Sequence, residues 1–310
     1  MTETQTPPEA PGDAVTVAYV HSNQVTYSWH HSMVEMVGYD LAHESRIIRG
    51  GYIAMRCGAA GLPEARNRTI TEFLESRDAD WLLWVDTDMG FPADTAERLL
   101  AAADPAERPI VGALCFSQRE TEADGMGGWR CTAVPTIFDW ARLPETGREG
   151  FLVRWDYPHA AVTRCAGTGS ACILIHRSVF EAVKEKYGAT WYNMAPNPTT
   201  GQLIGEDLSF CARAGSLGIA VHVDTGLAAS HMKQLWLAED DYWAERITDP
   251  AALLRGGTMS VMFGKPLKIT ATWPEGPPEG MSEEDLAAAA DGLDAQRGRL
   301  ADGVAQEPEL

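Results

Sequence analysis

The sequence lacks the cysteine pattern of a zinc-ribbon or disulfide-rich protein. Its six cysteines include no C-x-x-C pair, and most of them lie inside apolar runs such as IVGALCF and ACILIH. Cysteines placed in this way are typical of small, buried side chains. We therefore expect reduced, buried thiols and neither a zinc site nor a disulfide framework.

Long apolar runs are missing as well. No stretch approaches the roughly 18 to 20 consecutive apolar residues that a membrane-spanning helix requires. The first residues, MTETQTPPEAPGD, have neither the basic flank nor the apolar segment of an export signal. These absences predict a cytoplasmic protein without a membrane span.

Basic residues are scarce. Lysine and arginine together number 25, against 44 aspartates and glutamates, and the formal net charge is -19. A molecule with this charge repels polyanions as a whole, which disfavours general nucleic-acid binding. A local basic groove is still compatible with the composition.

The chain has enough apolar residues for one large domain, since 45% of its 310 residues are hydrophobic. The two ends differ from the rest because they are rich in Pro, Glu, Thr or Ala and have little to bury. We expect an N-terminal tail over 1–13, one α/β domain over 14–271, and a mostly disordered C-terminal tail over 272–310. Within that last tail, SEEDLAAAA could form one short helix.

Between the tails, short apolar strands alternate with helical patterns, which is typical of an α/β sheet. Strands are predicted near 15–20, 46–48, 81–85, 110–116, 133–138, 151–157, 171–177 and 219–224. Helices are predicted near 29–37, from about 62, from a capping box at Asp94 and Glu97, from 178, and over 206–216. Residues 117–130 contain three glycines and little apolar periodicity, so they predict a long loop of the kind that covers a binding site.

The strongest motif is WLLWVDTDMGF, in which a buried strand ends in Asp86 and Asp88. In open α/β sheets ligands bind at the carboxyl edge of the strands. Residues two apart on an extended chain point the same way, so both carboxylates can face one hard cation such as Mn²⁺ or Mg²⁺. A divalent ion at this edge can neutralise a diphosphate leaving group.

Other kinds of site share parts of this Asp-x-Asp motif. An EF-hand loop is unsuitable because its sixth position would be Phe91 in place of glycine. A phosphatase of the haloacid dehalogenase type also has Asp-x-Asp after a strand, but this chain has Gly90 where that motif continues with Thr or Val. A pair of solvated acids at a strand end is the simplest alternative and stays open.

A second motif, GEDLSFC, places Glu206 and Asp207 in the first turn of a predicted helix. Acids at this position stabilise the helix dipole, and either could also act as a general base toward a hydroxyl group. His231 follows the next predicted strand and could bind a metal through its imidazole, although a lone histidine is more often structural.

Taken in order, these segments resemble the GT-A glycosyltransferases, especially family-2-like members. The resemblance covers roughly 15–233 and rests on WVDTDMG, the Gly-rich segment before ACILIHRSVF, GEDLSFC, and VDT with a downstream histidine. It implies a GT-A type, Rossmann-like fold in a single domain, with a mixed, mostly parallel central sheet flanked by helices. It also implies a nucleotide-sugar donor, with UDP- or GDP-sugars expected, and a divalent cation, Mn²⁺ or Mg²⁺.

The resemblance also assigns site residues. The metal ligands implied are Asp86, Asp88 and His231, and the implied catalytic base is Asp207 or Glu206. The implied donor-binding residues are His21, Ser22, Asn23, Gln24, Arg66, Asn67, Asp86 and Thr87. On the acceptor side we expect Gly167, Thr168, Gly169, Ser170 and the aromatic pair Trp191 and Tyr192, which could stack on a sugar or pack in the core.

The sequence thus predicts a metal-dependent enzyme that transfers one sugar to a hydroxyl acceptor. The Gln-x-x-Arg-Trp motif of processive synthases is absent, so repeated transfer is disfavoured. A protein, a glycan, a small metabolite and a modified DNA base all remain as acceptor classes, and both inverting and retaining outcomes stay open. The alternatives are a metal-dependent phosphohydrolase built around Asp86 and a non-catalytic protein that binds nucleotide sugars or glycans.

Overall fold

The structure, a computed structural model, describes residues 13–123, 128–142, 149–197 and 200–233, with the backbone alone over 119–132. Most of the predicted N-terminal tail and the whole C-terminal tail lie outside the described residues, as does the predicted domain end at 271. The described residues group into a main unit over 13–119 and 132–233, and a second unit that contains 120–131.

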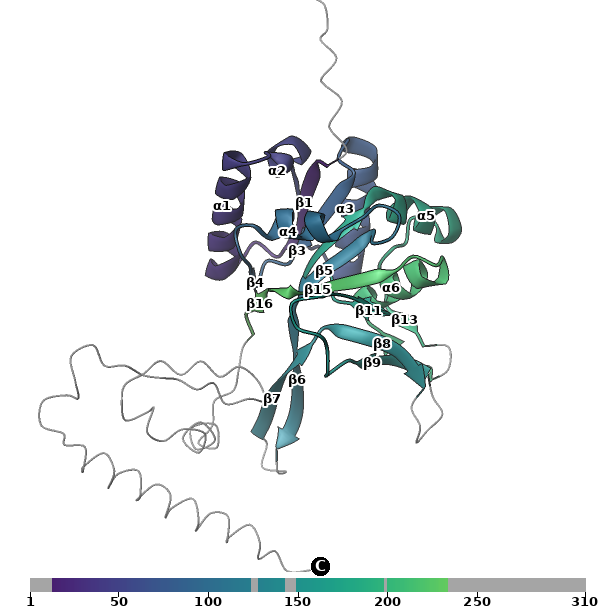
Figure 1. The fold of residues 1–310 in the computed structure, drawn as a ribbon. Helices are drawn as coiled ribbons and strands as arrows, with labels where there is room; N and C mark the ends of the chain where they lie inside the picture. Colours follow the sequence, from purple (N-terminus) through teal and green to yellow (C-terminus); the bar gives the residue numbers. More distant parts are fainter. Residues whose placement is uncertain (1–12, 124–127, 143–148, 198–199, 234–310) are drawn as a thin grey trace, which may run out of the picture. The chain divides into compact units, whose positions relative to one another are not determined.

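A seven-stranded sheet forms the centre of the main unit, with the strand order β10-β15-β5-β12-β3-β1-β2 (Figure 1). Five strands run in one direction, and β12 and β10 run against their neighbours. The predicted mixed, mostly parallel sheet is therefore confirmed. Its strands are β1 (Val15–His21), β2 (Tyr52–Arg56), β3 (Trp81–Val85), β5 (Ile110–Leu114), β10 (Val162–Cys165), β12 (Cys172–His176) and β15 (Val221–Ala228).

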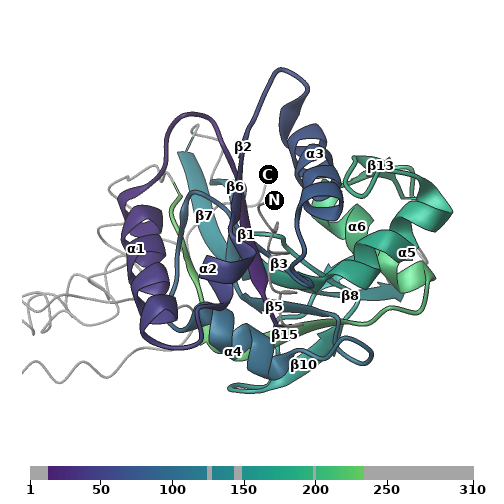
Figure 2. The same cartoon turned by 90° about the horizontal axis from the view of Figure 1, so that it is seen from above.

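Helices cover both faces of the sheet, as Figure 2 shows from above. One face carries α1 (Tyr27–Ala42), α2 (Arg46–Gly50) and α4 (Thr95–Ala102). The other carries α3 (Gly61–Ser76), α5 (Arg177–Tyr187) and α6 (Glu206–Ser216). Gly50 lets α2 end against the first strand, because a Cβ there would lie 2.1 Å from the carbonyl oxygen of Val15.

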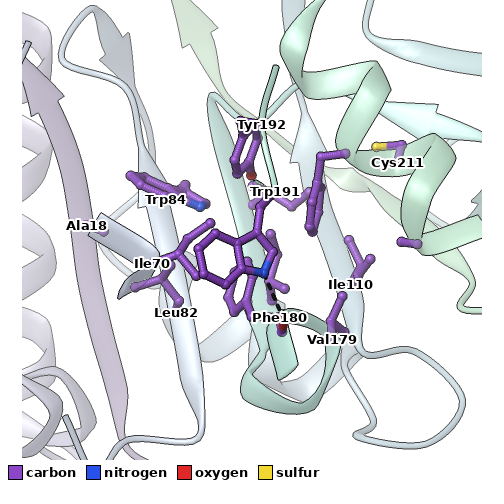
Figure 3. Packing of buried hydrophobic residues seen from close by; sticks show 14 of the residues in the cluster. Ala18, Ile70, Leu82, Trp84, Ile110, Val179, Phe180, Trp191, Tyr192 and Cys211 are labelled. Carbon is purple, nitrogen blue, oxygen red and sulfur yellow. Dashed lines mark hydrogen bonds between the residues drawn. The ribbon is translucent and has the colours of Figure 1, made fainter. Parts of the chain in front are cut away.

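The central strand β3 is buried at every position because it supplies both apolar cores. Successive side chains of a strand point to opposite faces, so Trp81, Leu83 and Val85 pack with the first set of helices. Leu82 and Trp84 pack with the second set, in the cluster drawn in Figure 3. An apolar run without alternation is what a strand covered on both faces requires.

The other described strands form small, separate sheets. A three-stranded sheet has the order β11-β8-β9, and three strand pairs are β4 with β16, β13 with β14, and β6 with β7. Their bounds are β4 (Met89–Gly90), β6 (Phe116–Ala123), β7 (Gly128–Pro135), β8 (Ile137–Arg142), β9 (Glu149–Val153), β11 (Gly167–Thr168), β13 (Ala195–Pro196), β14 (Leu203–Ile204) and β16 (Ser230–His231).

Three local predictions are corrected by the structure. Residues 46–48 are helical, because the carboxylate of Asp40 accepts hydrogen bonds from the N–H groups of Ile47 and Ile48 and so caps a short helix. The predicted loop over 117–130 contains most of β6 and the first residues of β7, since strand pairing satisfies the backbone without apolar periodicity. The side chain of Asp94 makes no capping hydrogen bond, and Glu97 accepts from Arg46 instead.

The predictions about membrane-spanning helices and about the cysteines can be compared with the described residues. Within them, no helix is long and apolar enough to cross a bilayer. The five cysteines whose side chains are described are free thiols, and four of these are buried: Cys115, Cys165, Cys172 and Cys211. The predicted buried thiols are confirmed at those four positions, and Cys131 lies outside the described side chains.

Candidate functional site

The turn after β3 brings Asp86, Thr87 and Asp88 to the carboxyl edge of the sheet. The N–H of Asp86 donates to the carbonyl of Ala171 (2.8 Å), which continues the sheet by one residue. The N–H of Met89 then donates back to the carbonyl of Asp86 (3.1 Å), so the chain turns here. The segment is therefore not extended as the sequence suggested, and the two carboxylates meet different partners.

The strand pair β4 and β16 carries His231 to this turn. His231 lies opposite Met89 in the pair, and the N–H of Met232 donates to the carbonyl of Asp88 (2.8 Å). As a result, Nε2 of His231 lies 3.0 Å from Oδ2 of Asp88. Main-chain hydrogen bonds thus hold together two of the three predicted metal ligands, which are 143 positions apart in the sequence.

A main-chain carbonyl orients the imidazole ring of His231. Its Nδ1 lies 2.8 Å from the carbonyl oxygen of Phe116, and a carbonyl can only accept, so Nδ1 carries a proton and donates. Nε2 consequently faces Asp88.

This pair fits two ligands of a divalent ion. Adjacent ligands bound octahedrally at about 2.1 Å from a metal lie about 3 Å apart, which matches the distance between Asp88 Oδ2 and His231 Nε2. A histidine that donates its other ring N–H to a carbonyl is the usual arrangement in metal sites. The spacing of Asp88 and His231 is thus compatible with two ligands of one divalent ion, whose other positions would need further ligands.

Asp86 does not join them. Among the residues that the structure describes, no three His, Cys, Asp or Glu side chains gather closely enough to hold a metal. The structure thus does not bring Asp86, Asp88 and His231 together as one group, and the carboxylate of Asp86 accepts a hydrogen bond from Nη2 of Arg66 (2.9 Å).

Arg66 is the buried cation of the site. Its side chain is 1% exposed, and its guanidinium carbon lies 5.0 Å from the ring centre of Trp84 and 5.5 Å from that of Tyr192. Besides Asp86, its Nη2 lies 3.9 Å from Oδ1 of Asp207. Nε and Nη1 of Arg66 and Oδ1 of Asp207 are buried without a hydrogen-bond partner among the described residues. One guanidinium therefore links the strand carboxylate to the helix carboxylate.

Removal of this cation should destabilise the fold. Arg66→Met leaves Asp86 and Asp207 without their shared partner, and loss of one member of a buried ion pair typically costs about 3–5 kcal/mol. We expect urea unfolding at pH 7 to show a loss of this order. Asp86→Asn added to Arg66→Met should restore part of it, since it removes one uncompensated charge.

The stability of Arg66→Met should depend on pH in a defined direction. Burial already raises the pKa of Asp86, and Arg66 opposes that rise. Without Arg66 the pKa of Asp86 in the folded state should rise further above its pKa in the unfolded chain. The free energy of unfolding should then fall as the pH increases from the unfolded-state pKa through the folded-state pKa. Arg68→Met, an exposed arginine on the same helix, is the matched control. A pH-independent deficit would contradict this account of Asp86.

A cavity of about 650 Å³ opens beside the turn. Predicted donor residues that line it are Ser22, Gln24, Asp86 and Thr87, and residues that sequence reasoning missed are Val20, Val25, Thr26, Tyr27, Ser28, Leu62 and Met232. Both the N–H and the hydroxyl of Thr26 donate to the carbonyl of Thr87 (2.9 and 3.2 Å), which ties the loop after β1 to the turn. His21, the last residue of β1, and Asn23, in the loop, do not line the cavity, and the N–H of Asn23 donates to Nδ1 of His21.

The predicted glycine segment lies against the start of α6. A Cβ at Gly167 would lie 2.9 Å from Cδ2 of Leu208 and 2.9 Å from Cε1 of Phe151, so a larger side chain would push the helix away. A Cβ at Gly169 would lie 3.8 Å from Oδ2 of Asp207. The segment thus allows the first turn of α6, which carries Glu206 and Asp207, to approach β11.

Other predicted contact residues are buried in the core. Trp191 and Tyr192 are 0% exposed, and the indole N–H of Trp191 donates to the carbonyl of Phe180 (Figure 3). The side-chain amide of Asn67 accepts hydrogen bonds from the main-chain N–H groups of Trp191 and Tyr192 and donates one to the main-chain carbonyl of Tyr192. The expected sugar stacking and nucleotide contact are thus replaced by packing, because these side chains hold the 191–192 backbone against α3.

Thr168 and Ser170 are also buried, each at 1% exposure. The hydroxyl of Thr168 donates to the carbonyl of Thr136 (2.6 Å), and Ser170 shares a hydrogen bond with the hydroxyl of Tyr192 (3.1 Å). Both side chains therefore position the glycine segment, in place of the acceptor contact that the sequence suggested.

Lys233 is a site residue that sequence reasoning missed. Its Nζ lies 3.3 Å from Oδ2 of Asp88 and 2.6 Å from Nε2 of His231. The available signal was the spacing in HMK, because side chains two residues apart on an extended chain point to the same side.

Comparisons with known proteins give distant fold neighbours only. No protein-family model matches this chain. No curated protein matches it either. Among solved structures, A197 from STIV aligns at 14% identity and a TM-score of 0.43, over 71% of this chain and 86% of that one. GalNAc-T7, solved with UDP, GalNAc and Mn²⁺, aligns at 12% identity and a TM-score of 0.42, over 78% of this chain and 51% of that one.

Proposed function

We propose that this protein is a glycosyltransferase of the GT-A type that uses Mn²⁺ or Mg²⁺ to transfer one sugar from a UDP- or GDP-sugar to a hydroxyl acceptor. The observation that carries the proposal is the distance of 3.0 Å between Nε2 of His231 and Oδ2 of Asp88, a residue that lines the cavity of about 650 Å³. Two convergent metal ligands beside a cavity at the carboxyl edge of the sheet suit a donor that carries a diphosphate.

The cavity lining suits the nucleotide half of such a donor. Tyr27 is 80% exposed and offers an aromatic face, and the side chain of Ser28 lines the same cavity. A nucleotide in this cavity would place its diphosphate near Asp88, where a bound divalent ion would offset the charge that develops on the leaving group. The Asp88 and His231 side chains hold that ion, and Asp86 lines the same cavity while it stays fixed by Arg66.

We assign Asp207 as the group that orients or deprotonates the acceptor hydroxyl. Its side chain is 29% exposed, and it is not among the residues that line the cavity. A carboxylate can lower the barrier to attack only if it reaches the hydroxyl directly or through one water. The first-turn neighbour Glu206 is the alternative base.

The phosphohydrolase alternative has less support. It requires Asp86 as a nucleophile, but one oxygen of this carboxylate is engaged by the buried guanidinium of Arg66. The pairing instead suits a carboxylate with a fixed binding role.

A screen of UDP- and GDP-sugars with Mn²⁺ tests the proposal directly. We expect at least one donor to raise the thermal unfolding midpoint and to be hydrolysed slowly, because water can replace a missing acceptor. Excess chelator should abolish hydrolysis, and added Mn²⁺ or Mg²⁺ should restore it. Full activity in chelator would refute the metal assignment, and turnover of a simple phosphate ester without a sugar donor would favour the phosphohydrolase. Donor binding without hydrolysis or transfer would favour a non-catalytic binding protein.

A further inference from the structure

The ammonium of Lys233 contacts both members of the Asp88 and His231 pair. Nζ lies 3.3 Å from Oδ2 of Asp88 and 2.6 Å from Nε2 of His231. These are the two atoms that fit a divalent ion, so the lysine and the metal would use the same position.

The protonation of the cluster follows from its donors and acceptors. An ammonium has three N–H donors and no acceptor, so its contact with His231 requires a bare lone pair on Nε2. The proton of the neutral imidazole is on Nδ1, which donates to Phe116. The atoms Nε2 and Oδ2 are then both acceptors, and they cannot bond to each other. Both are turned toward one cation, and that cation is Lys233.

We propose that Lys233 fills the cation position of the Asp88 and His231 pair when no divalent ion is bound, and that a divalent ion must displace it. The inference rests on the proposed metal-dependent function. A displaced ammonium needs a new anionic partner, and the diphosphate of the donor is the one that the site would supply. Metal and nucleotide should therefore strengthen each other's binding.

The geometry allows this exchange without rearrangement of the backbone. The main chain at Met232 is held by a hydrogen bond to the carbonyl of Asp88, whereas the side chain of Lys233 is 35% exposed. A lysine has a flexible four-carbon stem, so its head group can leave one carboxylate and reach another anion nearby. The two ligands stay in place because their supports, Phe116 and the strand pair, do not involve Lys233.

The test is Mn²⁺ binding to the nucleotide-free protein, measured by titration calorimetry. Lys233→Met keeps the length of the stem and removes the cation, so we expect it to bind Mn²⁺ about tenfold more tightly than the parent, within the range of typical coupling energies. With saturating UDP the difference should shrink, because the diphosphate has already drawn the ammonium away in the parent. Lys184→Met, an exposed lysine on α5, controls for the change in net charge.

The outcomes separate this inference from the proposed function. Equal or weaker Mn²⁺ binding by Lys233→Met overturns the role of Lys233, even if both proteins bind Mn²⁺ with UDP and the metal-dependent function stands. A gain that is matched by Lys184→Met also overturns it. If neither protein binds Mn²⁺ with or without UDP, the metal assignment itself fails. Asp88→Asn in the Lys233→Met chain should abolish the tight binding, which identifies the site being measured.

Discussion

Asp88→Asn is expected to weaken donor binding in the presence of metal by 100-fold or more. Asn keeps the size of the side chain but removes the negative charge that a hard cation requires. Loss of a partner that only supports a metal ligand costs about 10- to 100-fold in affinity, and loss of a ligand itself should cost more. Calorimetry with Mn²⁺ and a UDP- or GDP-sugar measures this directly.

The variant should stay folded, because Asp88 lies at the edge of the sheet and its side chain is 35% exposed. Circular dichroism is the folding control. Asp78→Asn is the matched charge control, since Asp78 is an exposed residue before the opposite end of β3. If Asp88→Asn binds donor and metal as the parent does, Asp88 is not a metal ligand.

The parts of this fold that the sequence predicts are those where local pattern and tertiary packing agree. The uninterrupted apolar run 81–85 requires a strand covered on both faces, and the structure confirms it as β3. The helix over 206–216 has the predicted bounds because an acidic first turn and an apolar face both favour it. The position of Asp86 and Asp88 at the end of a central strand follows from the same pattern.

The parts that the sequence does not predict depend on side chains distant in the chain. Residues 46–48 read as a strand because only the fold places the carboxylate of Asp40 at two of their N–H groups. Trp191 could pack or stack in the sequence analysis, and only its burial beside α5 decides the matter. The division of Asp86 from Asp88 likewise depends on Arg66, which lies 20 residues before Asp86 on another element.

Pattern and spacing give the chemical character of the candidate site but not its contacts. The sequence places a histidine downstream of the last strand, yet its approach to Asp88 depends on the short pairing of β4 with β16. Strand pairs of two residues carry too little pattern to be read from sequence. The exposed residues that line the cavity, such as Tyr27 at the start of α1, have no apolar period either. Their place beside the site depends on the hydrogen bond from Thr26 to Thr87.

Asp207→Asn is expected to leave donor binding intact while transfer to the acceptor falls by about 10²- to 10⁴-fold, the usual contribution of a general base. The carboxylate of Asp207 lies beside Gly169 and 3.9 Å from Arg66, and it touches none of the groups that fit the metal. Asn has the same shape but cannot accept a proton, so the pocket should keep its geometry.

Glu206→Gln is the matched comparison, because Glu206 shares the first turn of α6 with Asp207. Donor affinity by calorimetry and transfer rate to an identified acceptor are measured for both variants, with circular dichroism as the folding control. A large loss in transfer for Asp207→Asn with little change for Glu206→Gln assigns the base to Asp207. The reverse pattern assigns it to Glu206, and parental transfer by both variants refutes a general base on this helix.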